Sequence, residues 1–295
     1  MKREIALIVC LSLVVAALAS AGWSSAGRFG SGWSGSGWSR AGLFGGGRYS
    51  RVVDRTFEVT PDARLEIRSS SFDVSLVPGS GTALRVHGTL RGSSRAQIDG
   101  VRVTMQESGD RRIIAIEAPA GGFEFVHFLD AHFTVGVPRL AALAIVATSG
   151  DLGVADPSAP LDVQTSSGDV TVDRARESVA IKTSSGDVIV RQAAAAVRTA
   201  TKSGDVQVHD LGGSLSSTST SGDLSAALAA NWSGSSLTMH STSGDIDLRV
   251  PPGFHGALHT STNSGDVRND AKLSAALAGA IPIDLTSSSG AINVH

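Results

Sequence analysis

Polar and apolar residues alternate one by one in short segments of the C-terminal half of the chain. Leu161-Asp162-Val163-Gln164-Thr165 and Val179-Ala180-Ile181-Lys182-Thr183 are two examples. A period of two is typical of a β-strand with one buried face, and the many β-branched residues in these segments favour a pleated strand. The pattern predicts a series of short strands, each with an apolar side that must be covered.

A Ser-Gly-Asp tripeptide separates these strands at regular intervals. The glycines of the first five copies are 18 residues apart, the later gaps are 22, 21 and 25 residues, and the last copy is the degenerate Ser289-Gly290-Ala291. A constant period indicates one unit that is repeated and stacked, and helix-pair repeats need about 30 residues or more. We therefore predict an all-β fold, a right-handed parallel β-helix (β-solenoid) with about 18 residues per coil.

The inward side of each coil is predicted by counting from the central glycine. Apolar residues recur two and four positions after it and seven positions before it, and a small residue lies three positions before it. In the coil around Gly186, we expect Val188 to be buried between Val170 and Val206 of the neighbouring coils. Asn269 interrupts the apolar series in one late coil.

The tripeptide itself is interpreted as a corner between two strands. Glycine permits the positive φ that a sharp corner requires, and Ser and Asp side chains can bond nearby backbone N–H groups. We assign the glycines and aspartates to a structural turn motif: Gly150, Asp151, Gly168, Asp169, Gly186, Asp187, Gly204, Asp205, Gly222, Asp223, Gly244, Asp245, Gly265 and Asp266.

These aspartates would form a ladder with one carboxylate per coil. At the strand spacing of ~4.8 Å, two such charges repel by about 0.9 kcal/mol even in water. Corner N–H groups and solvent could offset this repulsion, and so could calcium bound between coils, as in Gly- and Asp-rich calcium-binding repeats. Because the repeat lacks the further glycines and the second oxygen-rich turn of those proteins, we predict no metal and no cofactor.

The N-terminal residues predict export. Lys2 and Arg3 precede an apolar run, and Ala19-Ser20-Ala21 is a small-x-small cleavage site, so residues 1–21 are interpreted as a signal peptide. An uncleaved membrane anchor is the alternative. Cys10 follows Val9 rather than Gly or Ala, so lipidation is not expected, and cleavage would leave a chain without cysteine.

Residues 22–48 form a Gly/Ser/Trp-rich linker in which Trp23, Trp33 and Trp38 could contact sugars or a membrane interface. Residues 49–295 form the predicted solenoid, with irregular leading coils over 49–142 and regular Ser-Gly-Asp repeats over 143–295. The leading strands are expected at 51–59, 64–67, 72–77, 83–90, 101–106, 112–117 and 132–137. A short helical insertion is expected at 271–280.

The last repeat ends at Ala291-Ile292-Asn293-Val294-His295. If it is the final coil of the stack, its unpaired backbone groups invite strand addition. This predicts self-association through the C-terminal edge, unless residues 271–280 fold back over it.

Composition and candidate catalytic residues favour a protein that does not act on nucleic acid and is not an enzyme. The net charge is −2, which does not indicate a nucleic-acid partner. Paired carboxylates apart from the corner aspartates and a Gly-x-Ser-x-Gly motif are both absent from the sequence. His127, Asp130 and His132, and separately His255 with His259, are the histidine clusters, and we expect loop histidines rather than zinc ligands.

The exported leader, the Val137-Pro138 strand end and the repeated Thr-x-Ser-Gly-Asp-Val units together resemble the bacterial putative-adhesin β-solenoid family, a domain of unknown function. The resemblance covers roughly residues 50–295 and implies a β-helix at the cell surface, in the periplasm or outside the cell, with no catalytic residues. It favours binding or structural display, with a glycan or an envelope protein as the partner. A β-helix carbohydrate-active enzyme and a self-assembling envelope scaffold or stress-response partner remain the alternatives.

Overall fold

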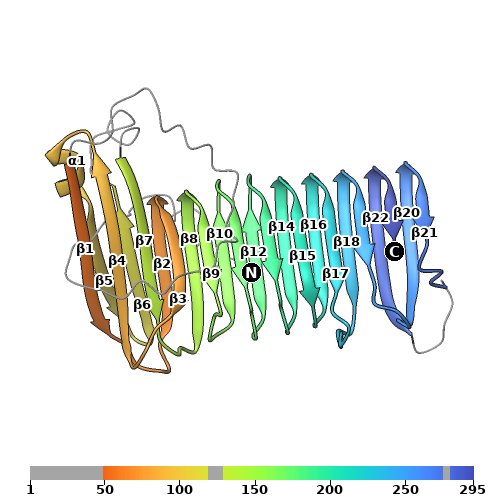
Figure 1. The fold of residues 1–295 in the computed structure, drawn as a ribbon, viewed down its shortest axis with the longest axis horizontal. Helices are drawn as coiled ribbons and strands as arrows, with labels where there is room; N and C mark the ends of the chain where they lie inside the picture. Colours follow the sequence, from red (N-terminus) through yellow and green to blue (C-terminus); the bar gives the residue numbers. More distant parts are fainter. Residues whose placement is uncertain (1–48, 119–128, 275–279) are drawn as a thin grey trace, which may run out of the picture.

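The alternating segments pair into two long β-sheets that face each other along a rod (Figure 1). The computed structural model describes residues 49–118, 129–274 and 280–295. Sheet A contains, in spatial order, β20 (Gly256–Ser264), β22 (Ile281–Ser289), β18 (Leu237–Ser243), β16 (Leu215–Ser221), β14 (Val197–Ser203), β12 (Val179–Thr183), β10 (Leu161–Thr165), β8 (Ala142–Ser149), β2 (Arg64–Ser71), β6 (Arg111–Glu117) and β5 (Arg102–Ser108). Sheet B contains β1 (Tyr49–Glu58), β4 (Ala83–Gly92), β7 (Leu129–Val137), β3 (Asp73–Pro78), β9 (Leu152–Ala155), β11 (Val170–Asp173), β13 (Val188–Arg191), β15 (Val206–Leu211), β17 (Leu224–Leu228), β19 (Ile246–Arg249), β23 (Ile292–Val294) and β21 (Val267–Asn269).

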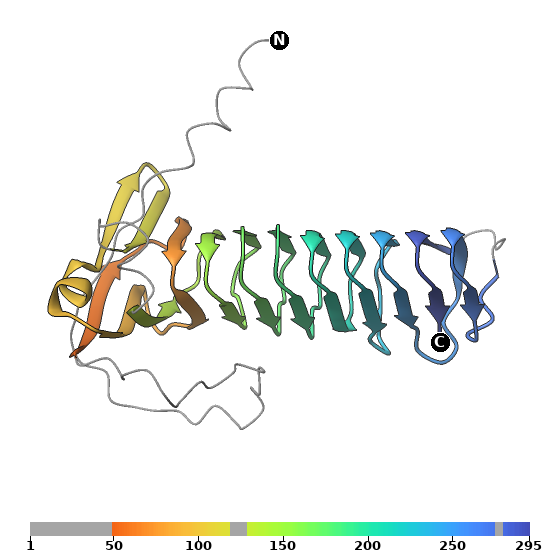
Figure 2. The same cartoon turned by 90° about the horizontal axis from the view of Figure 1, so that it is seen from above.

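Each regular coil contributes one strand to each sheet, and the strands of neighbouring coils run parallel, as Figure 2 shows from above. Val188 is opposite Val170 on one side and Val206 on the other. The three side chains are 1%, 0% and 1% exposed, respectively. The predicted all-β solenoid and the inward register of these positions are therefore confirmed, whereas its right-handedness stays a prediction.

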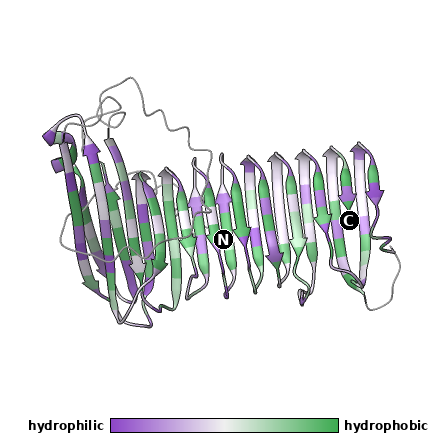
Figure 3. Cartoon of the chain, viewed as in Figure 1, coloured by the Kyte–Doolittle hydropathy of each residue, from purple (hydrophilic) through white to green (hydrophobic). Residues whose placement is uncertain are grey.

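The core between the sheets is thin and consists mainly of Val, Leu and Ile side chains. Along the strands, hydrophobic and hydrophilic residues alternate, which is visible in the colours of Figure 3. Polar residues also lie in this core, among them Thr199 and Ser217. The hydroxyls of Thr199 and Ser217 are 2.7 Å apart and bond each other, so these groups are not left without a partner in the apolar interior.

The stacking order at the C-terminal end corrects one prediction. The final strands of the sequence, β22 and β23, do not end the stack, because β22 lies between β18 and β20, and β23 lies between β19 and β21. Ile292 and Val294 are fully buried. The expectation that these two residues form an open C-terminal edge was therefore wrong, and β20 and β21 occupy the end of the rod.

The apolarity of the two coils explains this order. The inserted coil carries Leu285 and Ile292 at inward positions, and both are fully buried. The outer coil has the polar Asn269 at an inward position, and its Val267 is 48% exposed. Placing the more apolar coil between two neighbours buries more hydrophobic surface than the reverse order would.

The leading residues continue the same two sheets. β2 and β3 form a first coil, because they pair in parallel with β8 and β9. Beyond them, β4 is antiparallel to both β1 and β7, and β5 is antiparallel to β6. All seven strands predicted before residue 142 are present, with ends that differ by a few residues.

One helix, α1 (Arg95–Gly100), was not predicted. Ser94 accepts a hydrogen bond from the Gln97 N–H, and the Gln97 side chain accepts one from the Ser94 N–H. This capping box was the available sequence signal. Within the part of the chain that the structure describes, no helix is long and apolar enough to cross a membrane.

Some predictions fall on residues outside the described ranges. These are the signal peptide, the linker with its three tryptophans, and His127. Of the predicted helical insertion, residues 271–274 are described. They are not helical, because Ser274 forms an isolated parallel bridge with Ala257 of β20 and Ala271 lies in a turn.

Candidate functional site

The glycine corners stack directly on one another along one edge of the rod. Gly186 has φ +112°, and a Cβ at this position would lie 2.3 Å from the carbonyl oxygen of Gly168. The residue must therefore be glycine for two reasons: the backbone angle disfavours other residues, and the coil beneath leaves no space for a side chain. Gly186 thus lies with a positive φ at the position where the sequence pattern predicts a corner.

The corner aspartates form the expected ladder, and its bonding explains how the charges are accommodated. The Asp187 Oδ1 accepts the backbone N–H of Asp205 at 2.8 Å, and the Val188 N–H donates to the Asp205 carbonyl at 2.8 Å. The same carboxylate-to-N–H bond links the pairs 151/169, 169/187, 205/223 and 223/245 at 2.8–3.0 Å. Each carboxylate thus gains a hydrogen bond that offsets repulsion by its neighbours.

The ladder extends beyond the predicted motif at one end and is interrupted at the other. Asp73 accepts the N–H of Asp151, so Ser71-Phe72-Asp73 is an unrecognised first corner. Phe72 takes the place of glycine here without a positive φ, and its buried ring packs on Phe133 at a centroid distance of 5.5 Å. At the other end, Asp245 accepts the N–H of Ala291. Ala291 has no carboxylate that could accept the N–H of Asp266, so the ladder is interrupted there.

The described residues contain no cluster of metal-ligating side chains. No group of three or more His, Cys, Asp or Glu side chains there is placed to hold a metal ion. Asp130 and His132 lie on β7, whereas His255 precedes β20 and His259 lies on the exposed face of that strand. Burial raises the pKa of the Glu117 carboxyl on β6, an effect that the nearby Arg102 guanidinium opposes.

The outer face of sheet A presents a row with one residue from each coil, and this row is mainly polar but includes Val146 and Ala200. Gln164 is opposite Lys182, and farther along Thr218, His240 and Thr286 are opposite one another in turn. Near the corners, Gln164, Ser166, Lys182, Ser184 and Lys202 line an open depression of about 400 Å³. We refer to these five residues as the lysine depression.

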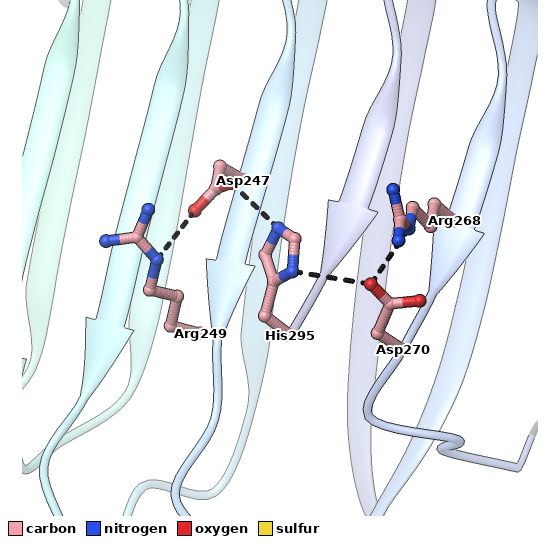
Figure 4. Close-up of polar contacts among 5 residues, drawn as sticks. All are labelled: Asp247, Arg249, Arg268, Asp270 and His295. Atoms are coloured by element: carbon pink, nitrogen blue, oxygen red, sulfur yellow. Dashed lines mark ion pairs between the residues drawn. The ribbon is translucent and has the colours of Figure 1, made fainter.

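At the C-terminal end of the rod, the outer face of sheet B carries charged side chains, whereas the outer face of sheet A carries hydroxyls. Figure 4 shows a chain of ion pairs that crosses three strands. Asp247 lies 3.4 Å from Arg249 and 3.2 Å from His295, and Asp270 lies 3.8 Å from His295 and 2.8 Å from Arg268. These exposed contacts join the inserted strand β23 to both neighbours, and each contributes little on its own.

Comparison with known proteins identifies the fold. A family model described as Toastrack DUF4097 matches residues 63–295. A putative adhesin from Bacteroides fragilis is 12% identical, with a TM-score of 0.51 over 83% of this chain and 97% of its own. A putative lipid binding protein from Parabacteroides distasonis is 14% identical, with a TM-score of 0.50 over 83% and 96% of the two chains. At these identities the similarity concerns the fold alone. A search of curated proteins gave no match.

Proposed function

This chain belongs to the Toastrack DUF4097 family, and on that premise we propose that it is an exported binding protein of the cell envelope that acts without catalysis, in the manner of an adhesin. The two sheets supply a rigid rod, and the outer face of sheet A supplies the contact surface. Export rests on the basic, apolar and small-residue segments of residues 1–21.

The observation that carries this proposal is the lysine depression. Lys182 and Lys202 are exposed cations from neighbouring coils, and Gln164, Ser166 and Ser184 add amide and hydroxyl groups around them. Hydroxyls and amides suit the hydroxyl groups of sugars, and two lysines favour a negatively charged ligand. We therefore assign the depression to glycans that contain acidic sugars.

The repeat extends this surface beyond the depression. Beyond Ala200, the same row continues with Thr218, His240 and Thr286 on successive coils. A linear glycan that lies along the rod could contact several coils at once, so many weak contacts would add up to useful avidity. An open surface of this kind suits a chain-like ligand better than an enclosed small molecule.

A glycan array tests the proposal. The purified protein is expected to bind acidic glycans, and Lys182→Ala with Lys202→Ala should weaken that binding at least tenfold. Lys272→Ala is the matched control, because it removes one exposed lysine charge at the end of the rod. Equal binding by the double variant and the parent would contradict the assigned surface. Release of shortened or unsaturated sugars during the incubation would instead favour the carbohydrate-active enzyme.

A further inference from the structure

Among the described strands, none pairs with the outer side of β20 or β21, so these two strands form the end of the rod (Figures 1 and 2). Val267 lies at the same position of its coil as Val188 and Ile292. Its side chain is 48% exposed, whereas those two are 1% and 0% exposed. This apolar core position is therefore open to solvent at the end of the stack.

Part of this end is covered by the chain itself. The Asn269 side chain bonds both the N–H and the carbonyl of Leu273, at 3.2 and 2.9 Å. The Leu258 N–H donates to the Ser274 carbonyl at 3.0 Å. Ala271 and Leu273 also pack against the core. Residues 271–274 were expected to fold back over the final coil of the sequence, but they instead cover part of the end formed by β20 and β21, the half that is remote from the Ser-Gly-Asp corner.

The corner half of the end, residues 260–267, carries the hydrogen-bonding groups that stack one interior coil on the next. In the interior, one carboxylate and the next residue's N–H together hold the backbone N–H and carbonyl of a single residue in the following coil, as Asp187 and Val188 hold Asp205. Asp266 and Val267 present the same acceptor and donor. No residue among those the structure describes occupies the next position of the ladder.

The stacking of glycines restricts what can occupy that position. A Cβ on Gly244, Gly265 or Gly290 would lie 2.1–2.2 Å from the carbonyl oxygen of the glycine on which it stacks. A strand added in the same register therefore needs glycine over Gly265. The second residue after this glycine should be apolar, because it would cover Val267 as Ile292 covers Ile246 in the interior.

We propose that the corner half of the rod's end is a docking site for an extended strand of another polypeptide that carries glycine, any residue and an apolar residue in succession. The bound strand would bend at its glycine, so that the part before the glycine runs parallel to β20, the part after it runs parallel to β21, and the two together add a further partial coil. Backbone bonds would provide affinity, and the glycine and apolar positions would provide specificity, as in other complexes formed by strand addition.

A peptide that copies one interior coil is the probe. A labelled peptide of residues 179–191 should bind the full-length protein saturably in fluorescence anisotropy. Asp266→Ala should weaken binding about tenfold, because it removes a charged acceptor. Asp162→Ala is the matched control, since it removes an exposed carboxylate from the outer face of sheet A and should leave binding unchanged.

A second peptide tests the glycine requirement. The same peptide with Gly186→Val should show no saturable binding, because its side chain would meet the Gly265 carbonyl. Absence of binding by the parent peptide, or equal binding by both peptides, would overturn the proposal. Concentration-dependent dimers in sedimentation that Asp266→Ala dissociates would also overturn it, because a second copy of this chain would then occupy the end.

Discussion

Substitution of Gly186 by alanine separates the two reasons for glycine at a stacked corner. The positive φ of +112° imposes a strain of about 1–3 kcal/mol on a residue with a side chain. The added Cβ would also lie 2.3 Å from the Gly168 carbonyl oxygen, more than 1 Å closer than ordinary contact. Overpacking of this kind costs about 1–3 kcal/mol, so we expect the free energy of unfolding to fall by roughly 2–6 kcal/mol.

Gly253→Ala is the matched control for this prediction. Gly253 has φ +78°, but a Cβ there would meet no atom within 4 Å. The control should therefore lose only the conformational part, about 1–2 kcal/mol. Urea unfolding followed by circular dichroism measures both changes, and at a slope of about 1–3 kcal/mol per molar urea the Gly186 variant should have the lower midpoint by a resolvable margin. Equal midpoints for the two variants would refute the argument that corner stacking excludes a side chain.

Two further predictions concern the core and the ladder. Val188→Asp places an unpaired carboxylate between Val170 and Val206, so we expect the middle coils to unfold and limited proteolysis to cleave them; a protease-resistant variant would contradict the inward register. Asp187→Ala removes the acceptor for the Asp205 N–H and should lower the free energy of unfolding by about 1 kcal/mol. Asp266→Ala removes a corner carboxylate that has no following coil, so it should leave the urea midpoint unchanged, and equal losses in the two variants would argue against the ladder.

The inward positions could be predicted from the sequence because each stacks on its counterpart in the next coil. Val170, Val188 and Val206 share one environment, and one pattern therefore describes all three. The role of Asp73 was missed because Phe72 takes the place of glycine, and a search for Ser-Gly-Asp does not find it. The later corners combine a positive φ with close stacking on the coil before them, whereas Phe72 has no positive φ.

The order of the last coils could not be predicted from the repeats, because it depends on which of the two coils has the more apolar inward positions. Both copies fit the same strand pattern, and chain order favoured placing Ile292 last. The structure places this coil inside because the competing coil carries Asn269 at an inward position. The lysine depression was also not recognised as a unit, since Gln164, Lys182 and Lys202 become neighbours only through the register of the coils.

The insertion of β22 and β23 has a consequence for the order in which the rod is completed. Ile246 bonds Ala291, which is far along the chain, rather than the corner at Asp266 that follows it directly. The chain is synthesised from the N-terminus, so β20 and β21 are complete before residues 280–295. Until those residues follow, β20 and β21 cannot pair with their final neighbours. The earlier coils can be added one after another with short loops, whereas this closure joins distant segments and is slower. Folding of the rod's end must therefore wait for its last sixteen residues, however early the rest of the stack has formed.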